Sequence, residues 1–582
     1  MSTTAPESDG SSTEATTSAT GGHGIRPSVF WPALILLAIV VAISTIFADG
    51  TGEVLQALQD NVIGTFGWYY TLIVTGFVLF SIWVGAGRFG DIKLGPDDAP
   101  ADYSFLQWFV MLFAAGMGIG LVFWGAAEPL SFYAAPKPGV EGDDIELAQE
   151  AMAQTFLHWG LHAWAIYVVV GLALAYAIHR RGRSVSLRWV LEPLLGDRVK
   201  GTAGDIIDVV AIIGTVAGVA TSLGLGVSQI AAGLEYLGVV DQANNTVLVV
   251  LIVVITAIAT LSVVSGLDKG IKWLSNFNLG LAALFVVALL LLGPTLFILR
   301  SFVENIGGYL FGIIPLSFDT SAFFGADGQQ WQGWWTTFYW GWWMSWAPFV
   351  GIFIARISRG RTVREFVFGV LLVPTLVSMV WFSVLGGSAL YRELFGEGGL
   401  IAEDGTVSAP SVLFNLVGDL PGGTLLAGVT IVLVTIFFVT SSDSGSLVVD
   451  MLASGGDPNP PTWSRVLWSV IEGLVAISLL LAGGLAALQT GAILVALPFS
   501  VIMVAMCFAM YKEFHSEYVE TERLNRLARR KVLTEEIGGT VTTDLVENFD
   551  DHFGDRVDQH IDEKLSRTGE LPVVDRGSDR PS

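Results

Sequence analysis

Residues 331–346 read WQGWWTTFYWGWWMSW and hold seven of the chain's nineteen tryptophans. Trp342, Trp343 and Trp346 are three or four positions apart, so on a helix their indole rings lie on one side. Membrane helices ordinarily carry tryptophan singly near their ends, at the level of the lipid headgroups. A dense cluster within a helix favours another purpose, because an indole face attracts a cation without N–H donors, such as a quaternary ammonium group. Lipid anchoring with aromatic packing is the alternative, and composition does not separate the two.

The composition of the whole chain is that of a polytopic membrane protein. Of its 582 residues, 52% are hydrophobic and 14% are charged, whereas soluble domains carry about 25% charged residues. Apolar runs of about 20 residues, each long enough to cross a bilayer as a helix, recur along the chain. The net charge of −23 disfavours a nucleic-acid partner. The single Cys507 excludes an intramolecular disulfide and offers no metal cluster.

We therefore predict an all-α integral membrane fold with about twelve spans. The predicted spans lie at about 28–48, 62–86, 104–130, 152–178, 206–234, 246–265, 274–299, 331–355, 366–390, 424–449, 465–483 and 489–511. The amphipathic segment 300–312 is predicted to lie along the membrane interface instead of crossing it. Residues 1–27 are predicted to form a disordered tail, since the Ser/Thr/Gly-rich start lacks the apolar core of a cleavable signal. Residues 512–582 form a polar, acidic, helix-prone tail with a basic patch at 523–531.

Lysine and arginine distinguish the two sides of the predicted membrane. If the N-terminus is cytoplasmic, the loops on that side carry fifteen Lys and Arg residues. The opposite loops carry three, Lys137, Arg300 and Arg392. Cytoplasmic loops carry such an excess in membrane proteins. The count predicts a multi-pass protein of the cell (plasma) membrane with both termini in the cytoplasm.

Three glycines interrupt the third predicted span, in the sequence Gly116-Met117-Gly118-Ile119-Gly120. Glycine is a poor helix former, so the span is predicted to break here and to free backbone carbonyls for a cation and amides for an anionic group. The alternative is that Gly116 and Gly120, four positions apart, let two helices approach closely.

The fourth predicted span carries a second group of aromatic residues. On a helix, Trp159, Trp164 and Tyr167 fall on a single arc, where they can form a wall opposite the first cluster. His158 and His162 have the spacing of metal ligands, but no third ligand is evident nearby. Packing histidines with hydrogen bonds are the favoured interpretation.

A run of hydroxyl groups lies inside the span at 424–449. Thr440 and Ser441 are hard oxygen ligands suited to Na⁺, and back-bonding of each hydroxyl to its own helix is the alternative. Asp443 is not explained by back-bonding, because a carboxylate within a membrane is costly and usually functional. The segment lacks the GxSxG elbow of serine hydrolases, and no nucleophile–base pair stands out, so an enzyme is not predicted.

Several of these segments resemble the betaine/choline/carnitine transporter (BCCT) family over residues 28–511. The matching segments are FGDIKLGPDDAP (89–100), GMGIGLVFWGAAEPL (116–130), FLHWGLHAWAIY (156–167), TSLGLG (221–226), FYWGWWMSWAPFVGIFIARISRGRTVREF (338–366) and TSSDSGS (440–446). The resemblance implies two leading helices followed by two inverted five-helix repeats of the leucine-transporter fold, at about 104–299 and 331–511. It also implies a homotrimer, with the interfacial helix between the repeats.

The resemblance also implies roles for individual residues. The substrate site would comprise the aromatic box and its neighbours: Trp159, Trp164, Tyr167, Trp342, Trp343, Trp346, Gly116, Gly118, Gly120 and Ser222. The sodium site would comprise the backbone of Ala114, Met117 and Phe437 and the hydroxyls of Thr440 and Ser441. Gly120 keeps the betaine-type pattern, since choline-type members tend to place an acid near the end of the glycine motif. Thr215 is followed one turn later by Val219, which has no hydroxyl for the family's second sodium site.

The prediction is a secondary active transporter, not an enzyme, that imports glycine betaine or a related quaternary ammonium compatible solute for osmoprotection. Transport would be Na⁺ symport by alternating access, with Na⁺ as the coupling ion and no cofactor. The predicted partners are a small zwitterionic or cationic methylated ammonium substrate, Na⁺, membrane lipids and two further copies of the chain. The alternatives are a sodium-independent antiporter, an H⁺-coupled choline or carnitine carrier, and an osmosensor or channel-like protein with little transport.

Overall fold

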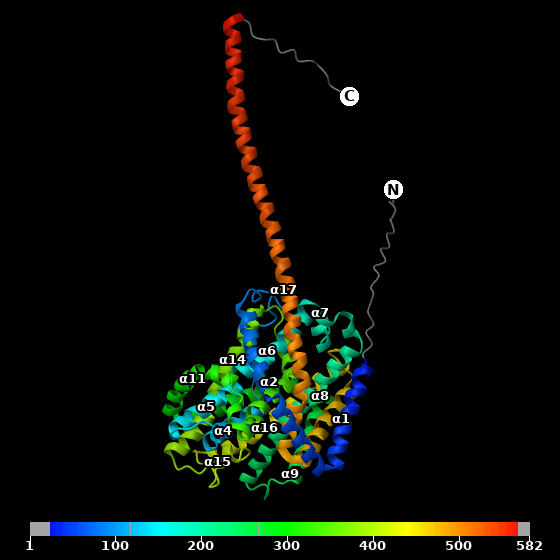
Figure 1. Ribbon diagram of the computed structural model, residues 1–582, viewed down its shortest axis with the longest axis vertical. Coiled ribbons are helices and arrows are strands. Elements are labelled where there is room, and N and C mark those ends of the chain that lie inside the picture. The colour runs from blue at the N-terminus through cyan, green and yellow to red at the C-terminus, as the bar shows by residue number, and fades with distance from the viewer. Residues whose placement is uncertain (1–23, 117, 266–267, 569–582) are drawn as a thin grey trace, which may run out of the picture. The chain divides into compact units, whose positions relative to one another are not determined.

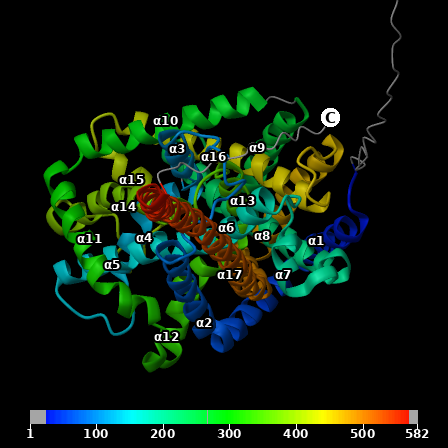
Figure 2. The ribbon, with the colours of Figure 1, turned by 90° about the horizontal axis from the view of Figure 1, so that it is seen from above.

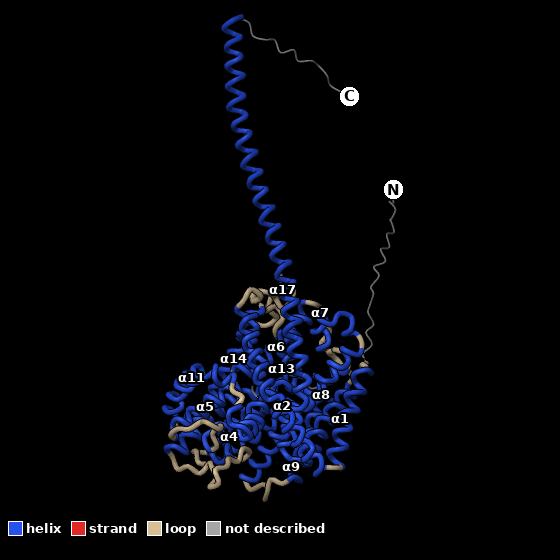
Figure 3. Tube along the Cα trace, viewed as in Figure 1, coloured by secondary structure: helices blue, strands red, loops and turns tan. Residues whose placement is uncertain are grey.

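The computed structural model describes residues 24–116, 118–265 and 268–568. Within these ranges the chain is built of helices and loops (Figure 3), and its β-structure is limited to an isolated bridge between Lys93 and Thr362. The chain divides into two units, Met1–Glu513 and Phe514–Ser582. The predicted all-α class is confirmed.

The helices are labelled in Figure 1. In chain order they are α1 Pro27–Ile46, α2 Ala48–Ala86, α3 Phe105–Gly116, α4 Ile119–Ala134, α5 Asp144–Trp159, α6 Leu161–Ala175, the π-helical turn η1 Tyr176–Arg180, the 3-10 turn η2 Leu187–Leu191, α7 Glu192–Leu195, the 3-10 turn η3 Gly196–Lys200, α8 Thr202–Tyr236, α9 Asn245–Ser265, α10 Asp268–Leu292, α11 Thr295–Phe318, the 3-10 turn η4 Ala322–Phe324, α12 Gly325–Gln332, the π-helical turn η5 Gly333–Thr337, α13 Phe338–Ile357, α14 Val363–Phe395, α15 Val412–Gly418, α16 Gly423–Ala453 and α17 Thr462–Thr568. Two of them begin with a capping box, Asp143 with Glu146 before α5 and Thr362 with Glu365 before α14.

Among the described residues, ten helices are long and apolar enough to cross a membrane. The predicted span 104–130 is missing from them because it is broken into α3 and α4, each shorter than a bilayer. Helix α13 is missing too, and it carries the tryptophan cluster, whose rings contribute little to mean hydropathy. Helix α17 contains both predicted spans 465–483 and 489–511, with a kink at Gly483 and Gly484 between them. With α11 set aside as an interfacial helix, the twelve predicted segments are all helical.

Two helices extend beyond the segments predicted for them. Helix α2 begins at Ala48 instead of near residue 62, because its first, more polar turns are also helical. The segment 300–312 belongs to a longer helix, α11, that runs beyond both predicted ends. Gly293 and Pro294 separate α11 from α10, and Figure 2 shows α11 along the edge of the bundle, lying across the view. Its placement at the membrane interface stays a prediction.

The two predicted repeats pack on each other in a reciprocal way. Helix α4, in the first span of one repeat, packs on α14, the second span of the other. Helix α6, in the second span of the first repeat, packs on α13, in the first span of the second repeat, and α8 packs on α16, third against third. A twofold axis that exchanges the repeats requires this pattern, and an odd number of spans in each repeat gives them opposite orientations. Figure 2 shows α6, α8 and α13 in the middle of the bundle.

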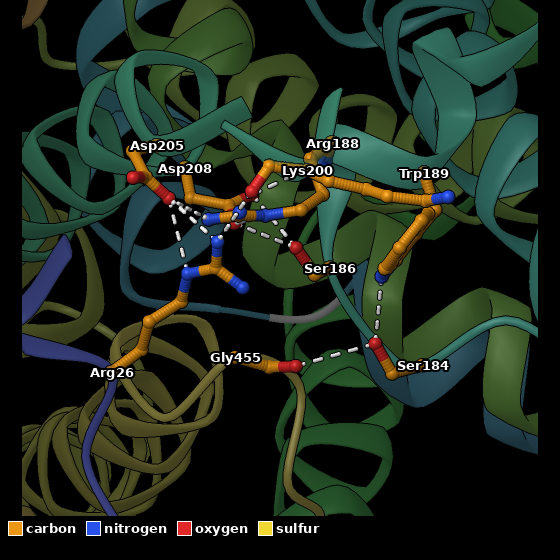
Figure 4. A network of polar contacts seen from close by, with 9 residues as sticks. All are labelled: Arg26, Ser184, Ser186, Arg188, Trp189, Lys200, Asp205, Asp208 and Gly455. Carbon is orange, nitrogen blue, oxygen red and sulfur yellow. Dashed lines mark hydrogen bonds and ion pairs between the residues drawn. The ribbon is translucent and has the colours of Figure 1, made fainter. Parts of the chain in front are cut away.

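A buried network of charges fixes the chain before α1 to the first turns of α8 (Figure 4). Arg188 Nε donates to Asp208 Oδ2 at 2.6 Å, and Arg188 Nη2 lies 2.8 Å from Asp205 Oδ1. Arg26 Nε donates to the same Asp205 oxygen at 3.0 Å, and Ser186 Oγ donates to Asp208 Oδ2 at 2.7 Å. Arg188 and Asp208 are almost completely buried, so each is the other's main charge compensation.

The described part of the second unit, residues 514–568, is helical and almost entirely exposed. In the predicted basic patch, Arg523 lies 3.5 Å from Glu520, and Arg526 lies 4.0 Å from Glu522. These intrahelical ion pairs offset part of the positive charge of the patch. A solvated helical face is therefore the interpretation that the geometry of this unit favours.

The buried pair predicts a stability difference between two arginines of the same loop. Arg188→Met leaves Asp208 buried without its cation, which costs about 3–5 kcal/mol. Arg183→Met is the control, since the Arg183–Glu192 pair is partly exposed and contributes about 0–1 kcal/mol. Thermal unfolding of the purified proteins, followed by tryptophan fluorescence, should show a large drop in the midpoint for R188M alone. Equal midpoints for the two variants would contradict the role of the network.

Candidate functional site

A cavity of about 260 Å³ lies in the first unit, lined by residues of α4, α5, α6, α8, α10, α13, α14 and α16 and by Gly118. It brings together the glycine motif, both aromatic groups and the hydroxyl pair, which are far apart in the sequence. Its lining residues are Gly118, Ile119, Gly120, Leu121, Trp159, Ala163, Trp164, Tyr167, Ser222, Ser275, Asn278, Leu279, Trp342, Trp343, Trp346, Phe349, Val350, Phe353, Ser378, Phe437, Thr440, Ser441 and Ser444.

The two predicted aromatic walls meet in this cavity. The ring of Trp159 lies 4.9 Å from that of Trp343 at an interplanar angle of 73°, and Trp342 stacks on Trp343 at 4.6 Å. Trp164 and Tyr167 form a further edge-to-face pair, with their centroids 5.2 Å apart. Edge-to-face pairs hold aromatic rings in fixed orientations and leave some faces open. The arrangement is a box with aromatic faces on several sides.

Hydrogen bonds to α8 fix two of the indoles on the α13 side. Trp346 Nε1 donates to Gly218 O at 2.7 Å and to Ser222 Oγ at 2.9 Å. Trp342 Nε1 donates to the same Ser222 oxygen at 3.2 Å. Ser222, predicted as a polar group near the substrate, therefore lines the cavity and also orients two rings.

Behind the Trp159 ring lies a fully buried carboxyl group, that of Glu128. Glu128 Oε2 accepts from Trp159 Nε1 at 2.6 Å and from the hydroxyl of Tyr339, and Glu128 Oε1 lies 2.8 Å from His158 Nδ1. Trp343 Nε1 donates to the backbone oxygen of His158 at 2.9 Å. Both indoles on this side of the box are therefore tied to one layer of hydrogen bonds.

Of the histidine pair, His158 is packed and hydrogen-bonded as the sequence favoured, whereas His162 is packed but neither of its ring nitrogens has a hydrogen-bond partner among the described residues. His158 Nε2 lies 3.1 Å from Thr336 Oγ1, and the ring of His162 stacks on Trp340 with an interplanar angle of 19°. The described residues contain no cluster of three or more His, Cys, Asp or Glu side chains fit to hold a metal. Trp340 is buried on this side of α13 and does not line the cavity.

The predicted break in the third span is present. Helix α3 ends at Gly116, α4 begins at Ile119, and Gly118 between them is extended, with φ −157° and ψ −178°. Gly118 and Gly120 line the cavity. Met117 lies outside the described residues, and so do the surroundings of Ala114 and Gly116.

Gly120 allows the two aromatic walls to approach each other. A Cβ atom at this position would lie 2.5 Å from Cη2 of Trp342 and 2.9 Å from Cη2 of Trp159, closer than real side chains come. A Cβ atom at Gly118 would have no neighbour within 4 Å. Close packing therefore requires a glycine at position 120, whereas no neighbouring protein atom requires one at position 118.

The fourth span differs from its prediction in one respect. The single arc assumed a continuous helix, but α5 ends at Trp159 and α6 begins at Leu161, with Gly160 outside helical geometry between them. A Cβ atom at Gly160 would lie 2.4 Å from the Phe156 carbonyl oxygen and 2.9 Å from the Tyr309 hydroxyl. Trp159 nevertheless faces the same cavity as Trp164 and Tyr167.

Three of the predicted sodium ligands, Phe437, Thr440 and Ser441, line the cavity beside the break in the third span. Thr440 Oγ1 donates to the backbone oxygen of Ile436 at 2.9 Å, which is the back-bonding considered as the alternative to a sodium site. This bond leaves the lone pairs of the hydroxyl oxygen available. The other two predicted ligands, Ala114 and Met117, lie in the segment 113–117, whose surroundings the structure does not describe.

Asp443 does not face the cavity. Its Oδ1 atom lies 3.3 Å from Nη2 of Arg465, and the carboxyl group is nearly buried. Arg465 was counted among the loop residues, but its side chain is mostly covered at the start of α17. Asp443 is therefore compensated by an ion pair within the bundle.

The remaining tryptophans of the opening stretch lie away from the cavity. Trp334 is 40% exposed, whereas Trp335 is half-buried and packs edge-to-face on Phe132 at 4.6 Å. Trp331 also contacts Phe132, at 5.5 Å. Lipid contact suits Trp334, and aromatic packing accounts for the other two.

Sequence reasoning missed several residues of the site. Asn278 and Ser378 line the cavity, but single polar residues in apolar spans give no pattern to follow. Glu128 was not predicted as a site residue, because its three hydrogen bonds depend on tertiary contacts. Glu472 was overlooked, although a carboxylate in the middle of an apolar run is a signal that the sequence does carry.

The chain matches the model of the BCCT, betaine/carnitine/choline family transporter, over residues 28–519. It is 51% identical over 508 residues to an uncharacterized transporter of Mycobacterium tuberculosis, covering 86% of this chain and 85% of that one. It is 43% identical over 500 residues to the glycine betaine transporter OpuD of Bacillus subtilis, covering 86% and 96%. The high-affinity choline transport protein of Escherichia coli is 38% identical over 507 residues, covering 86% and 74%.

The match runs through both halves of the cavity, from the glycine motif to the hydroxyl pair, and extends over most of the length of each relative. The aromatic box, the broken third span and the all-helical bundle are thus features of a transporter and not of an enzyme. The chain belongs to the betaine/carnitine/choline family of membrane transporters.

Proposed function

We propose that the protein imports glycine betaine, or a closely similar zwitterion, by Na⁺ symport. The observation that supports this substrate is the aromatic box, which lies in a cavity without a charged residue among its described lining residues. The indole faces attract the trimethylammonium group. A cation alone would leave its charge uncompensated in this lining, whereas a zwitterion brings its own carboxylate.

The names of the relatives support this class of substrate. The relative from Bacillus subtilis is named for glycine betaine and the more distant one from Escherichia coli for choline. Gly120 favours the former, because an acidic side chain at this position would collide with Trp342 and Trp159. Import for osmoprotection and a trimeric assembly remain part of this proposal.

Alternating access requires that the substrate cavity be closed toward one side of the membrane at a time, and the cavity of this structure is closed at one end. Beyond the box, the hydrogen-bonded layer of Glu128, His158 and Tyr339 is fully buried. In the other direction the lining continues along α13 to Phe349 and Phe353, toward the end of α13 that carries Arg356. If the arginine-rich loops lie in the cytoplasm, as proposed, a cavity that opens at this end would correspond to an inward-facing state.

Sodium would bind beside the substrate. The Thr440 and Ser441 oxygens border both the cavity and the break in the third span, where carbonyl groups lack helical partners. Hydroxyl and carbonyl oxygens are the ligands that hard cations prefer. Sodium bound there would hold α16 against the broken helix and couple ion binding to the shape of the box.

Trp346→Leu should weaken glycine betaine binding. The change removes one aromatic face, and a cation–π contact contributes about 0.5–2 kcal/mol, or about a two- to thirtyfold change in Kd. Trp334→Leu is the control, since Trp334 is exposed and does not line the cavity. Tryptophan-fluorescence titration of both variants checks this, and equal Kd values would contradict a role for Trp346 in the box.

Gly120→Ala and Gly118→Ala form a matched pair two positions apart in one motif. The methyl group at position 120 must push Trp342 or Trp159 aside, and overpacking of about 1–3 kcal/mol corresponds to about a 5- to 150-fold loss of affinity. The methyl group at position 118 has no protein atom within 4 Å and should cost less affinity than the one at position 120. Titration with glycine betaine distinguishes the two, and equal losses would refute the packing role of Gly120.

Sodium coupling predicts that uptake into proteoliposomes stops when K⁺ replaces Na⁺ outside. Thr440→Val should raise the half-saturating Na⁺ concentration about tenfold, since it removes one oxygen ligand. Thr435→Val is the control, because Thr435 makes the same kind of back-bond but does not line the cavity. Full uptake in K⁺ would end the coupling proposal while leaving the substrate proposal intact.

A further inference from the structure

Glu472 is a second buried carboxyl group in the bundle, on the first half of α17. It is fully buried, and neither of its oxygens has a hydrogen-bond partner among the described residues. In this it differs from Glu128, whose oxygens are engaged by three side chains. It also differs from Asp208, which is paired with a buried arginine. Glu472 is not among the described residues that line the substrate cavity.

The groups around Glu472 come from two neighbouring helices. The Ser442 hydroxyl of α16 faces the carboxyl group without closing a hydrogen bond to it, and it too is buried without a partner. A Cβ atom at Gly445 of α16 would lie 3.4 Å from Glu472 Oε1 and 2.9 Å from Cγ2 of Val219 on α8. The carboxyl group therefore lies where α16, α8 and α17 meet.

Few charged side chains can compensate Glu472. Within the apolar runs that pack around it, α8 carries no charge between residues 209 and 234, and α9 carries none. Helix α16 carries Asp443, an acid, which faces Glu472 and is paired with Arg465 at 3.3 Å. Asp450, the other acid of α16, accepts a hydrogen bond from Ser464. An ionised Glu472 would lie beside another negative charge whose cation is already engaged.

The oxygen supply around Glu472 is too small for a sodium ion. A hard cation is held by several oxygen ligands, whereas Val219 and Gly445 offer none from their side chains and Ser442 offers one. A proton needs a single oxygen, and it neutralises the carboxylate that the apolar surroundings penalise. The site is thus suited to a proton.

Its position links this group to the transport site. On one turn of α16, Ser441 faces the cavity and Ser442 faces Glu472. A movement of α16 that opens or closes the cavity must also change the surroundings of the carboxyl group. Val219, which fills the predicted second sodium position, packs against Gly445 beside the same group.

We propose that Glu472 is a proton-binding site of the transport cycle, so that a proton moves with the substrate and sodium. One carboxylate oxygen takes a proton from water on one side of the membrane, which gives a neutral carboxylic acid, and later returns it to water on the other side. No other bond forms or breaks. This inference rests on the proposed function for its coupling to substrate, but not for the protonation itself.

The test compares the full-length wild type with Glu472→Gln and with the control Glu235→Gln, an exposed carboxylate at the end of α8. Glutamine mimics the protonated form and keeps the buried volume. Infrared difference spectra of the purified proteins isolate Glu472, because the contribution of the other fully buried glutamate, Glu128, is common to all three. Relative to E472Q, the wild type and E235Q should each show a carboxylic acid band that weakens as pH rises. A difference spectrum without such a band, or with a band that never responds to pH, overturns the proton site whatever the substrate is.

The coupling is measured in proteoliposomes that contain a trapped pH dye. Glycine betaine uptake driven by a Na⁺ gradient should acidify the lumen for the wild type and E235Q, and an inward proton gradient should speed uptake. In E472Q both effects should fall to the level of protein-free vesicles, while Glu472→Asp should restore part of them. Glycine betaine titration by tryptophan fluorescence shows that E472Q still binds. Equal acidification by E472Q and wild type overturns the proposal, whereas a wild type that moves no glycine betaine refutes the proposed function alone.

Discussion

The hydrogen bond from the indole N–H of Trp159 to the buried carboxyl group of Glu128 sets the geometry on which the site depends. The N–H group of a tryptophan in an apolar interior needs an acceptor, and Glu128 supplies it behind the ring. The ring face is then free to look into the cavity, and Trp343, anchored to the His158 carbonyl, meets its edge. Because the same carboxyl group accepts from Tyr339 on α13, both halves of the box are fixed by one group.

The breaks in two spans place these groups at one level of the bundle. Gly118 interrupts the third span beside the box, and Gly160 interrupts the fourth directly after Trp159. At the break in the fourth span, Gly160 lies against the Tyr309 hydroxyl of α11. Helix α11 thereby contacts the box wall from outside the repeats, and a displacement of α11 would reach Trp159 through a single residue.

Much of the fold and the site was predictable because membrane solvation leaves strong patterns in a sequence. Apolar runs of span length and the spacing of the tryptophans are local patterns, and the helices observed at these positions confirm both. The arginine bias is local too, and the orientation that it predicts stays a prediction. The break at Gly160 was not predictable, since a single glycine in an apolar run is tolerated in most helices. Its cause is tertiary, namely the close approach of Tyr309 and the Phe156 carbonyl.

The same distinction explains which polar residues were found. Thr440 and Ser441 belong to a dense run of hydroxyl residues, which can be recognised from the sequence alone. Asn278 and Ser378 are isolated polar residues whose role exists only because α10 and α14 turn them toward the same space. Asp443 was visible as a carboxylate not explained by back-bonding, but the sequence gives no sign that Arg465 lies 3.3 Å away.

The distribution of charge around the cavity follows from the free-energy cost of removing charged groups from water. A carboxylate in the cavity wall would bind any small cation, including Na⁺ and K⁺, and would weaken selection by shape. In this protein the acids stand one layer back: Glu128 behind Trp159, and Asp443 and Glu472 on the far side of α16. The cavity keeps a lining without charged side chains among the described residues, and its selectivity rests on indole faces. Helix α16 separates these two environments, because its Ser441 side faces the substrate space and its Ser442 side faces a carboxyl group. A rotation of this helix would therefore change both environments together, which is the physical requirement for coupling an ion to a solute without a shared site.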